Sequence, residues 1–197
     1  VELAQALAGC GIVIADVRFH GSTGSAGFFS TTQTGIVGFG EGVVMSSGQV
    51  STVEGPNSSS SAGTSLGLPG DDDLTSLCGN PTYDATVLEF DFIPSGTVVT
   101  FEYVFASEEY NEYVNSPYND VFAFYLNGVN MAVVPGTAIP VAINTVNNGY
   151  STTAVPPGDS PSVYDEYYLN NVREFSATVS DPRVDDERWA NLEMDGL

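Results

Sequence analysis

The stretch Phe101–Leu126 constrains the fold of this chain more than any other, because hydrophobic residues alternate with others along both of its ends. The side chains that would share a face are Val99, Phe101, Tyr103 and Phe105 at the start and Phe122, Phe124 and Leu126 at the end. Period-two alternation of β-branched and aromatic residues is typical of strands in a packed sheet. The pattern therefore predicts two hydrophobic strands with a polar connector between them.

The connector is rich in side-chain oxygen atoms. It carries Glu108, Glu109, Asn111, Glu112, Asn119 and Asp120. Calcium takes about six to eight oxygen ligands from carboxylates, amides and carbonyls. Closely spaced carboxylates repel one another unless a cation or protons lie between them. The connector is therefore a candidate calcium site, and a solvated acidic loop is the alternative.

The composition limits the partners of the chain. Its 197 residues, 42% of them hydrophobic, are enough for one domain with a real core. Lys and Arg number 4 against 25 Asp and Glu, which gives a formal net charge of -21. Such a chain repels phosphate backbones and anionic lipids, so nucleic acids and membrane surfaces are poor partners. Bound divalent cations or a salty medium would offset the charge, and no stretch is apolar enough for membrane insertion.

The two cysteines, Cys10 and Cys78, do not form a CxxC pair and are too few for a zinc site. We favour a disulfide that joins the N-terminal segment to the region of Asp71–Leu77; two buried free thiols are the alternative. A disulfide implies an oxidising compartment.

The N-terminal third predicts one short helix followed by strands. Leu3, Ala6 and Leu7 recur at helical spacing, and Gly9 would end this helix. The strands expected from the pattern and from the glycines between them are Gly11–Phe19, Gly27–Thr31, Gly35–Phe39 and Gly42–Ser46. The Ser-rich segment Ser51–Gly70 is expected to be a surface loop within a single domain that spans residues 1–197.

Three consecutive aspartates open the next segment, Gly70–Gly79, which is expected to enter one or two helical turns. Asp71 or Asp72 could cap them. A cap explains one aspartate but not three in a row. Asp71 and Asp73 therefore join the connector residues as candidate calcium ligands.

The rest of the chain continues the β pattern. A hairpin is predicted from Asp84–Ile93 and Thr97–Ala106, joined by the turn cluster Pro94-Ser95-Gly96. Asn127-Gly128, a strong hairpin signal, is expected to lead into a return strand. The further strands expected are Met131–Val134, Val141–Val146 and Phe175–Val179. Tyr164–Asn171 is dense in aromatics and could be an exposed ligand surface or tyrosines packed over a sheet edge.

Together these patterns predict an all-β fold, an antiparallel β-sandwich or jelly roll with one or two short helices.

Several motifs resemble a known family in the same order along the chain. They are LAGCGIVIADVRF at Leu7–Phe19, GDDDL at Gly70–Leu74, YDATVLEFDFIPSG at Tyr83–Gly96, YVFASEEYNEYVNSPYNDVFAFYLNG at Tyr103–Gly128, VPGTAIPVAINTVNNG at Val134–Gly149 and YYLNN at Tyr167–Asn171. The chain resembles the choice-of-anchor L family of bacterial exported surface domains. The resemblance implies a secreted or cell-surface location. In similar chains the segment matching Leu192–Leu197 runs on into further strands, so we expect C-terminal strands to be missing here or to come from another chain.

The leading functional hypothesis is a non-enzymatic, calcium-stabilised extracellular module for adhesion or surface assembly. Its expected partners are calcium and a peptide or glycan ligand or neighbouring copies. One alternative is a filament or surface-layer subunit completed by strand exchange with a neighbour, because an open sheet edge accepts an added strand. Another alternative is a carboxylate-dependent hydrolase. It is disfavoured because His20 is the only histidine and lies in a Gly/Ser loop that has no GxSxG elbow.

Overall fold

The computed structural model describes residues 1–9, 11–30, 38–54, 63–109, 113–147, 164 and 167. Internal contacts divide the chain into two compact units. The first unit contains Val1–Glu54, Gly63–Gly70 and Tyr83–Val104, and the second contains Gly55–Ala62, Asp71–Thr82 and Phe105–Leu197. A single domain over residues 1–197 stays a prediction.

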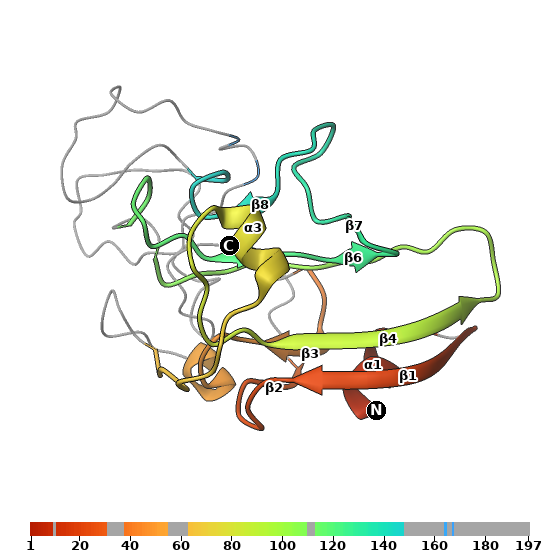
Figure 1. The fold of residues 1–197 in the computed structure, drawn as a ribbon. Helices are drawn as coiled ribbons and strands as arrows, with labels where there is room; N and C mark the ends of the chain where they lie inside the picture. The colour runs from red at the N-terminus through yellow and green to blue at the C-terminus, as the bar shows by residue number, and fades with distance from the viewer. Residues whose placement is uncertain are drawn as a thin grey trace, which may run out of the picture. The chain divides into compact units, whose positions relative to one another are not determined.

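The longest element of the first unit is an antiparallel strand pair, β1 (Ile12–His20) with β4 (Val87–Pro94), which run alongside each other in Figure 1. Both strands agree with the predicted ones. The register shifts between Ala15 and Arg18, where Asp16 has a φ of +49°. A bulge of this kind strengthens the local twist of the strand, and aspartate is among the residues that tolerate the left-handed region.

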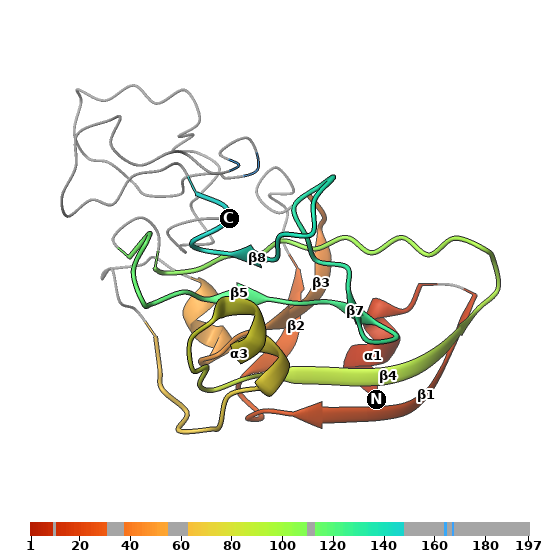
Figure 2. The ribbon, with the colours of Figure 1, turned by 45° about the horizontal axis from the view of Figure 1, so that its top comes forward.

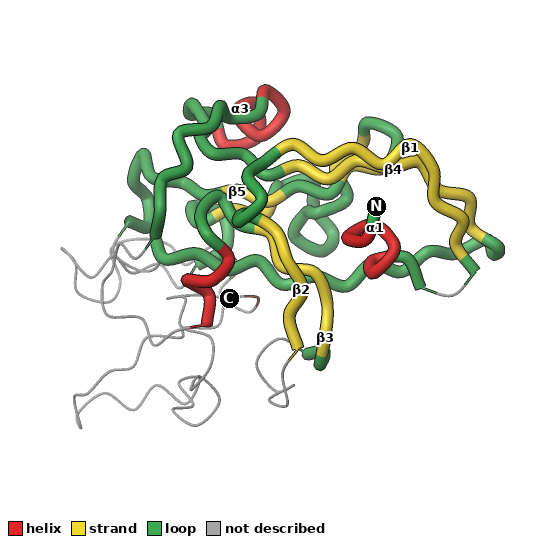
Figure 3. Tube along the Cα trace, turned by 90° about the horizontal axis from the view of Figure 1, so that it is seen from below, coloured by secondary structure: helices red, strands yellow, loops and turns green. Residues whose placement is uncertain are grey.

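The second strand pair of this unit is β2 (Ala26–Ser30) with β3 (Glu41–Met45), and both strands were predicted. Helix α1 (Glu2–Leu7) is drawn red beside the N-terminus in Figure 3. It contacts β3, and its Ala4 is completely buried. Most of the predicted strand at residues 35–39 lies outside the described residues. A 3-10 helix, η1 (Val50–Glu54), occupies the start of the predicted Ser-rich loop, and residues 55–62 of that loop are not described.

The predicted hairpin partner of β4 was wrong, because residues 97–106 do not form a strand. The β1–β4 ladder extends past the strand ends instead, where the Ser95 N–H donates to the Gly11 carbonyl at 2.9 Å. The predicted turn is thus bonded to the residue before β1. Residues 97–100, which follow the turn, are exposed to solvent, and Val98 is 81% exposed.

Two shorter strand pairs form the second unit. Strand β5 (Val121–Phe122) pairs with β8 (Val141–Ala142), as Figure 2 shows, and β6 (Tyr125–Leu126) pairs with β7 (Val129–Asn130). Asn127 and Gly128 connect β6 to β7 with φ values of +51° and +80°. Positive φ at both central residues is the geometry of a type I′ turn, so the Asn-Gly hairpin is confirmed. The return strand β7 ends before Met131, so the predicted return strand Met131–Val134 was wrong; within it Val133 makes only an isolated bridge to Pro140.

The predicted strands of this unit are shorter in the structure: Val141–Val146 is reduced to β8, and the strand before Asn127 is interrupted at Phe124. Asn130 Oδ1 accepts hydrogen bonds from the N–H groups of Phe124 and Ala132 at 3.1 and 3.0 Å. It thereby takes ladder positions that another strand would have filled.

The hydrophobic core of the second unit gathers around Ile143, which is fully buried. Its other buried members are Val114, Val134 and Val146, and Phe105, Ile139 and Tyr164 pack against them. Val114 comes from the connector that the sequence predicted to be polar. Of the tyrosine-rich segment only Tyr164 and Tyr167 are described; Tyr164 packs as the packing interpretation expects, whereas Tyr167 is 47% exposed.

All strand pairs of the described residues are antiparallel and the helices are short. The all-β class is therefore confirmed. The predicted strand Phe175–Val179 and the C-terminal residues lie outside the described part of the chain.

Candidate functional site

Asp71 is the N-cap of α3 (Asp72–Cys78). Its Oδ1 accepts the N–H groups of Asp73 and Leu74 at 3.0 and 3.1 Å. A cap of this kind satisfies backbone donors that have no partner within the helix. At the other end Gly79 adopts the left-handed conformation, with a φ of +74°, that ends many helices. The capping role predicted for Asp71 or Asp72 thus belongs to Asp71.

The return of the chain after α3 is fastened to its start by two threonines. Thr82 Oγ1 lies 3.0 Å from both the N–H and the carbonyl oxygen of Asp71 and 2.8 Å from Thr75 Oγ1. The cap aspartate is therefore held in place through its backbone as well as its side chain.

The α3 aspartates also act on a nearby strand. Burial raises the pKa of Tyr125 in β6, and the negative charges of Asp73 and Asp71 raise it further. Asp73 itself is exposed. Two of the predicted ligands thus create a negative field at the start of α3, close to β6.

In the connector, Asp120 is bound to a buried hydroxyl group. Ser107 Oγ donates to Asp120 Oδ2 at 2.8 Å and accepts the N–H of Glu109 at 3.0 Å. Asp120 is an exposed residue, although the protein around its carboxyl group raises the pKa by desolvation. The Ser107 hydrogen bond acts in the opposite direction and is too weak to cancel this effect. Ionised Asp120 is therefore a destabilised charge.

A network of amide side chains fixes the end of the connector. Asn119 Oδ1 accepts the Asn144 N–H at 2.9 Å. The Asn144 side chain in turn accepts the Asn115 N–H at 2.6 Å and donates to the Ser116 carbonyl at 2.9 Å. Since Asn144 follows β8 closely, these bonds bind the connector to the strand that pairs with β5.

The predicted ligands are brought together only in part. Helix α3 contacts β5, which begins directly after Asp120, so Asp71, Asp73 and Asp120 lie on adjoining elements. Glu108 and Glu109 are half-buried, and Asn111 lies outside the described residues. Among the described residues no three His, Cys, Asp or Glu side chains come close enough to hold a metal ion.

The second half of the predicted disulfide cannot be located, because Cys10 lies outside the described residues. Cys78 has no disulfide partner within the described part of the chain. Its Sγ lies 3.1 Å from the Asn80 carbonyl oxygen, as a thiol donor would. The disulfide stays a prediction.

Sequence reasoning missed a carboxylate of the first unit that accepts several hydrogen bonds, that of Asp84. The residue is 8% exposed, and its carboxylate accepts the N–H groups of Leu66 and Leu68 at 3.0 and 2.5 Å and the Ser65 hydroxyl at 3.2 Å. Burial alone would raise its pKa, but these donors, with the Gly67 N–H, outweigh burial and hold the pKa below its usual range. The donors come from a loop far back in the sequence, so no local pattern marks Asp84.

Comparison with known families identifies the family of the chain. Residues 2–187 match the model of the choice-of-anchor L domain, and the chain therefore belongs to the choice-of-anchor L family. It is a bacterial domain of the cell surface or of secreted proteins, and the family is not a known enzyme family. No curated protein and no solved structure matches the chain. None of the described helices has the length and apolarity needed to cross a membrane.

Proposed function

We propose that this chain is a non-enzymatic, calcium-stabilised extracellular module for adhesion or surface assembly. The observation that carries the proposal is the 2.8 Å hydrogen bond from Ser107 Oγ to Asp120 Oδ2, which fixes a carboxyl group whose pKa is raised by desolvation. A nearby divalent cation would stabilise the ionised form by direct charge attraction. Calcium binding at this point would convert a destabilised charge into a structural contact.

The donor chemistry around Asp120 suits calcium better than other metals. The Ser107 hydroxyl that is bonded to Asp120 and the side chain of the preceding Asn119 offer oxygen and no sulfur or imidazole. Calcium accepts hydroxyl, amide, carbonyl and water oxygens beside carboxylates. It therefore does not need three converging carboxylates. Asn119 Oδ1 already accepts one hydrogen bond, but an amide oxygen has a second lone pair.

The role of the ion in this proposal is to hold the connector rigid against β5 and β8. The connector supplies Val114 to the core and the carbonyl oxygen of Asp120 to the Ile143 N–H at 3.1 Å. Ordering it would stabilise the second unit and present the connector as a defined surface.

The test is thermal unfolding with calcium and with a chelator. Calcium at about 100 times its dissociation constant would add about 2.7 kcal/mol to the free energy of unfolding, a rise in Tm of about 5–10 °C. Asp120→Asn keeps an acceptor for Ser107 and removes the charge. Without calcium it should melt at or above the wild-type temperature, and it should lose most of the calcium-induced rise.

Asp91→Asn is the matched control, because Asp91 is an exposed residue of β4 and the same charge is removed there. It should keep the full response to calcium. A wild-type Tm that does not change on adding calcium contradicts the proposed role of the metal.

A further inference from the structure

A shallow hollow of about 360 Å³ lies within the first unit, and its lining residues are Gly38, Phe39, Phe101, Glu102 and Tyr103. Its volume is at the lower end of the range of small-ligand pockets. The proposed calcium ligands are all in the second unit, so this hollow is a separate feature.

One wall is a braced aromatic ring. The rings of Phe39 and Phe29 pack with their centroids 5.8 Å apart and tilted by 49°. Gly42 in β3 makes this packing possible, because a Cβ there would lie 2.9 Å from Phe29 Cε1. The ring of Phe39 is thus supported from β2 while it borders the hollow.

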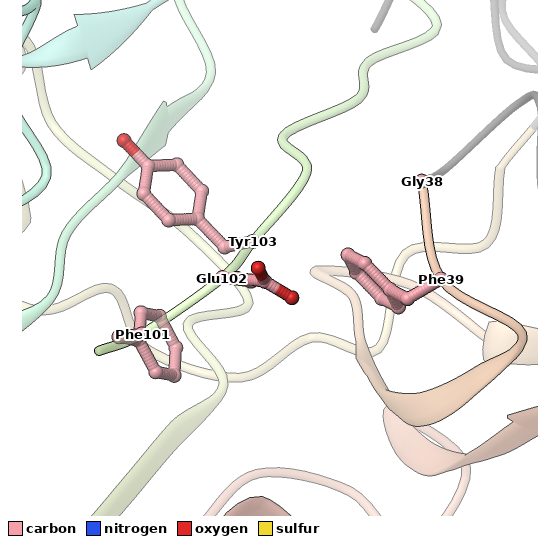
Figure 4. Close-up of a pocket in the computed structure, with 5 residues that line it drawn as sticks. All are labelled: Gly38, Phe39, Phe101, Glu102 and Tyr103. Atoms are coloured by element: carbon pink, nitrogen blue, oxygen red, sulfur yellow. The ribbon is translucent and has the colours of Figure 1, made fainter. Parts of the chain in front are cut away.

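The opposite wall is a carboxylate. Phe101 and Tyr103 stack on each other, with centroids 6.0 Å apart and planes 26° apart. Neighbouring side chains of an extended segment point to opposite sides. Glu102 therefore points away from this pair and toward Phe39, as Figure 4 shows.

A ring and a carboxylate that face each other across a hollow can bind one kind of group well. A guanidinium ion can stack its plane on the ring and direct its N–H groups to the carboxylate at the same time. An ammonium ion is a compact, strongly hydrated charge that lacks the flat surface. A neutral or anionic group would gain little from Glu102.

We propose that Phe39 and Glu102 form a binding site for an arginine side chain of a partner protein. Charge supports a different protein as the partner over a second copy. The chain carries a net charge of -21 and only 4 basic residues, all arginine, so two copies repel each other, whereas an arginine-bearing segment is attracted. This site is independent of calcium.

The experiment titrates the intact chain with the peptide acetyl-Gly-Arg-Gly-amide at an ionic strength of about 0.15 M, at which long-range attraction is screened. The same peptide with citrulline in place of arginine is the ligand control, since it keeps the shape and loses the charge. Glu102→Gln should weaken arginine binding about tenfold. Glu89→Gln removes an equal charge from an exposed position of β4 and should change binding less than about twofold.

The ring is tested by Phe39→Leu, with Phe28→Leu, at a residue that is 57% exposed, as control. Phe39→Leu should weaken binding about two- to fivefold. The arginine side-chain protons should also shift upfield in the NMR spectrum with wild-type protein, because they lie over an aromatic ring. If Phe39→Leu fails to fold, the site is tested by the comparison of Glu102→Gln with Glu89→Gln and by the NMR shift of the arginine protons. Equal losses for Glu102→Gln and Glu89→Gln, equal binding of citrulline, or an absent upfield shift would each overturn the site.

Discussion

At the scale of single residues, Asp84 shows how one carboxylate can replace several backbone partners. It has a φ of +52°, and its own N–H donates to the Leu68 carbonyl at 3.1 Å while its carboxylate accepts donors from the same loop. The loop is thereby joined to the entry of β4 without being part of a sheet. Such a carboxylate is needed because buried N–H groups without a partner are costly.

Asp84→Asn should destabilise the protein by about 1–3 kcal/mol, because the amide puts N–H groups among backbone donors that require an acceptor. The measurement is urea unfolding at neutral pH. Asp91→Asn, at an exposed position of the following strand, should cost less than about 0.5 kcal/mol. Equal stabilities of the two variants would contradict the role of Asp84.

The same residue has a pH signature. Its folded-state pKa lies below the ordinary value of 3.8, so the stabilisation is present at neutral pH and is lost as the pH falls through the acid range below that value. Asp120 acts in the opposite sense. Its raised pKa gives stability that is present at low pH and disappears as the pH rises through the folded-state value. Asp84→Asn should therefore flatten the loss of stability in acid.

At the scale of elements, the connector depends on Asn144, whose side chain bonds Asn115 and Ser116 at once. Asn144→Ala removes both hydrogen bonds and should lower the free energy of unfolding by about 1–3 kcal/mol. Amide hydrogen exchange should speed up at Asn115 and stay unchanged in β1 and β4. Gln5→Ala, which removes an exposed amide from α1, should have little effect. Unchanged exchange at Asn115 would show that the network does not hold the connector.

The elements also show which parts of the fold can be predicted from the sequence. Strands β1 and β4, the Asn-Gly turn and the capped α3 depend on residues within a few positions of each other, and local patterns predicted them. Local patterns did not predict which strands pair. The partner of β4 is β1, about 70 residues earlier in the sequence, whereas the sequence analysis assigned β4 to the hydrophobic segment that follows it, Thr97–Ala106. Local alternation marks a strand but carries no information on its neighbour.

In the candidate site, too, local features could be predicted from the sequence and contacts between distant residues could not. The sequence identified Asp71 and Asp120 as important because both lie in acidic segments, and the structure gives each a specific contact. It proposed Asn119 as a metal ligand, which stays a prediction, but it did not foresee that the amide oxygen of Asn119 accepts the Asn144 N–H. It overlooked Asp84, because the donors that meet its carboxylate are 16 to 19 residues away in the sequence. Chemical type can be read from sequence, but the partner of a polar group requires the fold.

At the scale of the whole molecule, a net charge of -21 opposes the folded state through self-repulsion and should make stability depend on ionic strength. Raising NaCl from about 0.01 M to about 0.15 M shortens the Debye length from about 30 Å to about 8 Å. In chelator, we expect this change to raise the Tm of the wild-type chain by about 2–4 °C. The doubly neutralised variant Glu89→Gln/Asp91→Asn should respond less, because two exposed charges of β4 are gone.

The salt response also separates general screening from a specific ion. Asp120→Asn should keep nearly all of the NaCl response, because one charge in a large excess is lost, yet it should lose the response to calcium. A Tm that is insensitive to NaCl would mean that the acidic side chains lie too far apart to repel one another. A calcium effect reproduced by NaCl at matched ionic strength would reduce the proposed ion to a screening charge. A bound structural ion requires that calcium, added back after chelator treatment, raises the Tm more than NaCl of the same ionic strength does. This additional rise must be lost in Asp120→Asn.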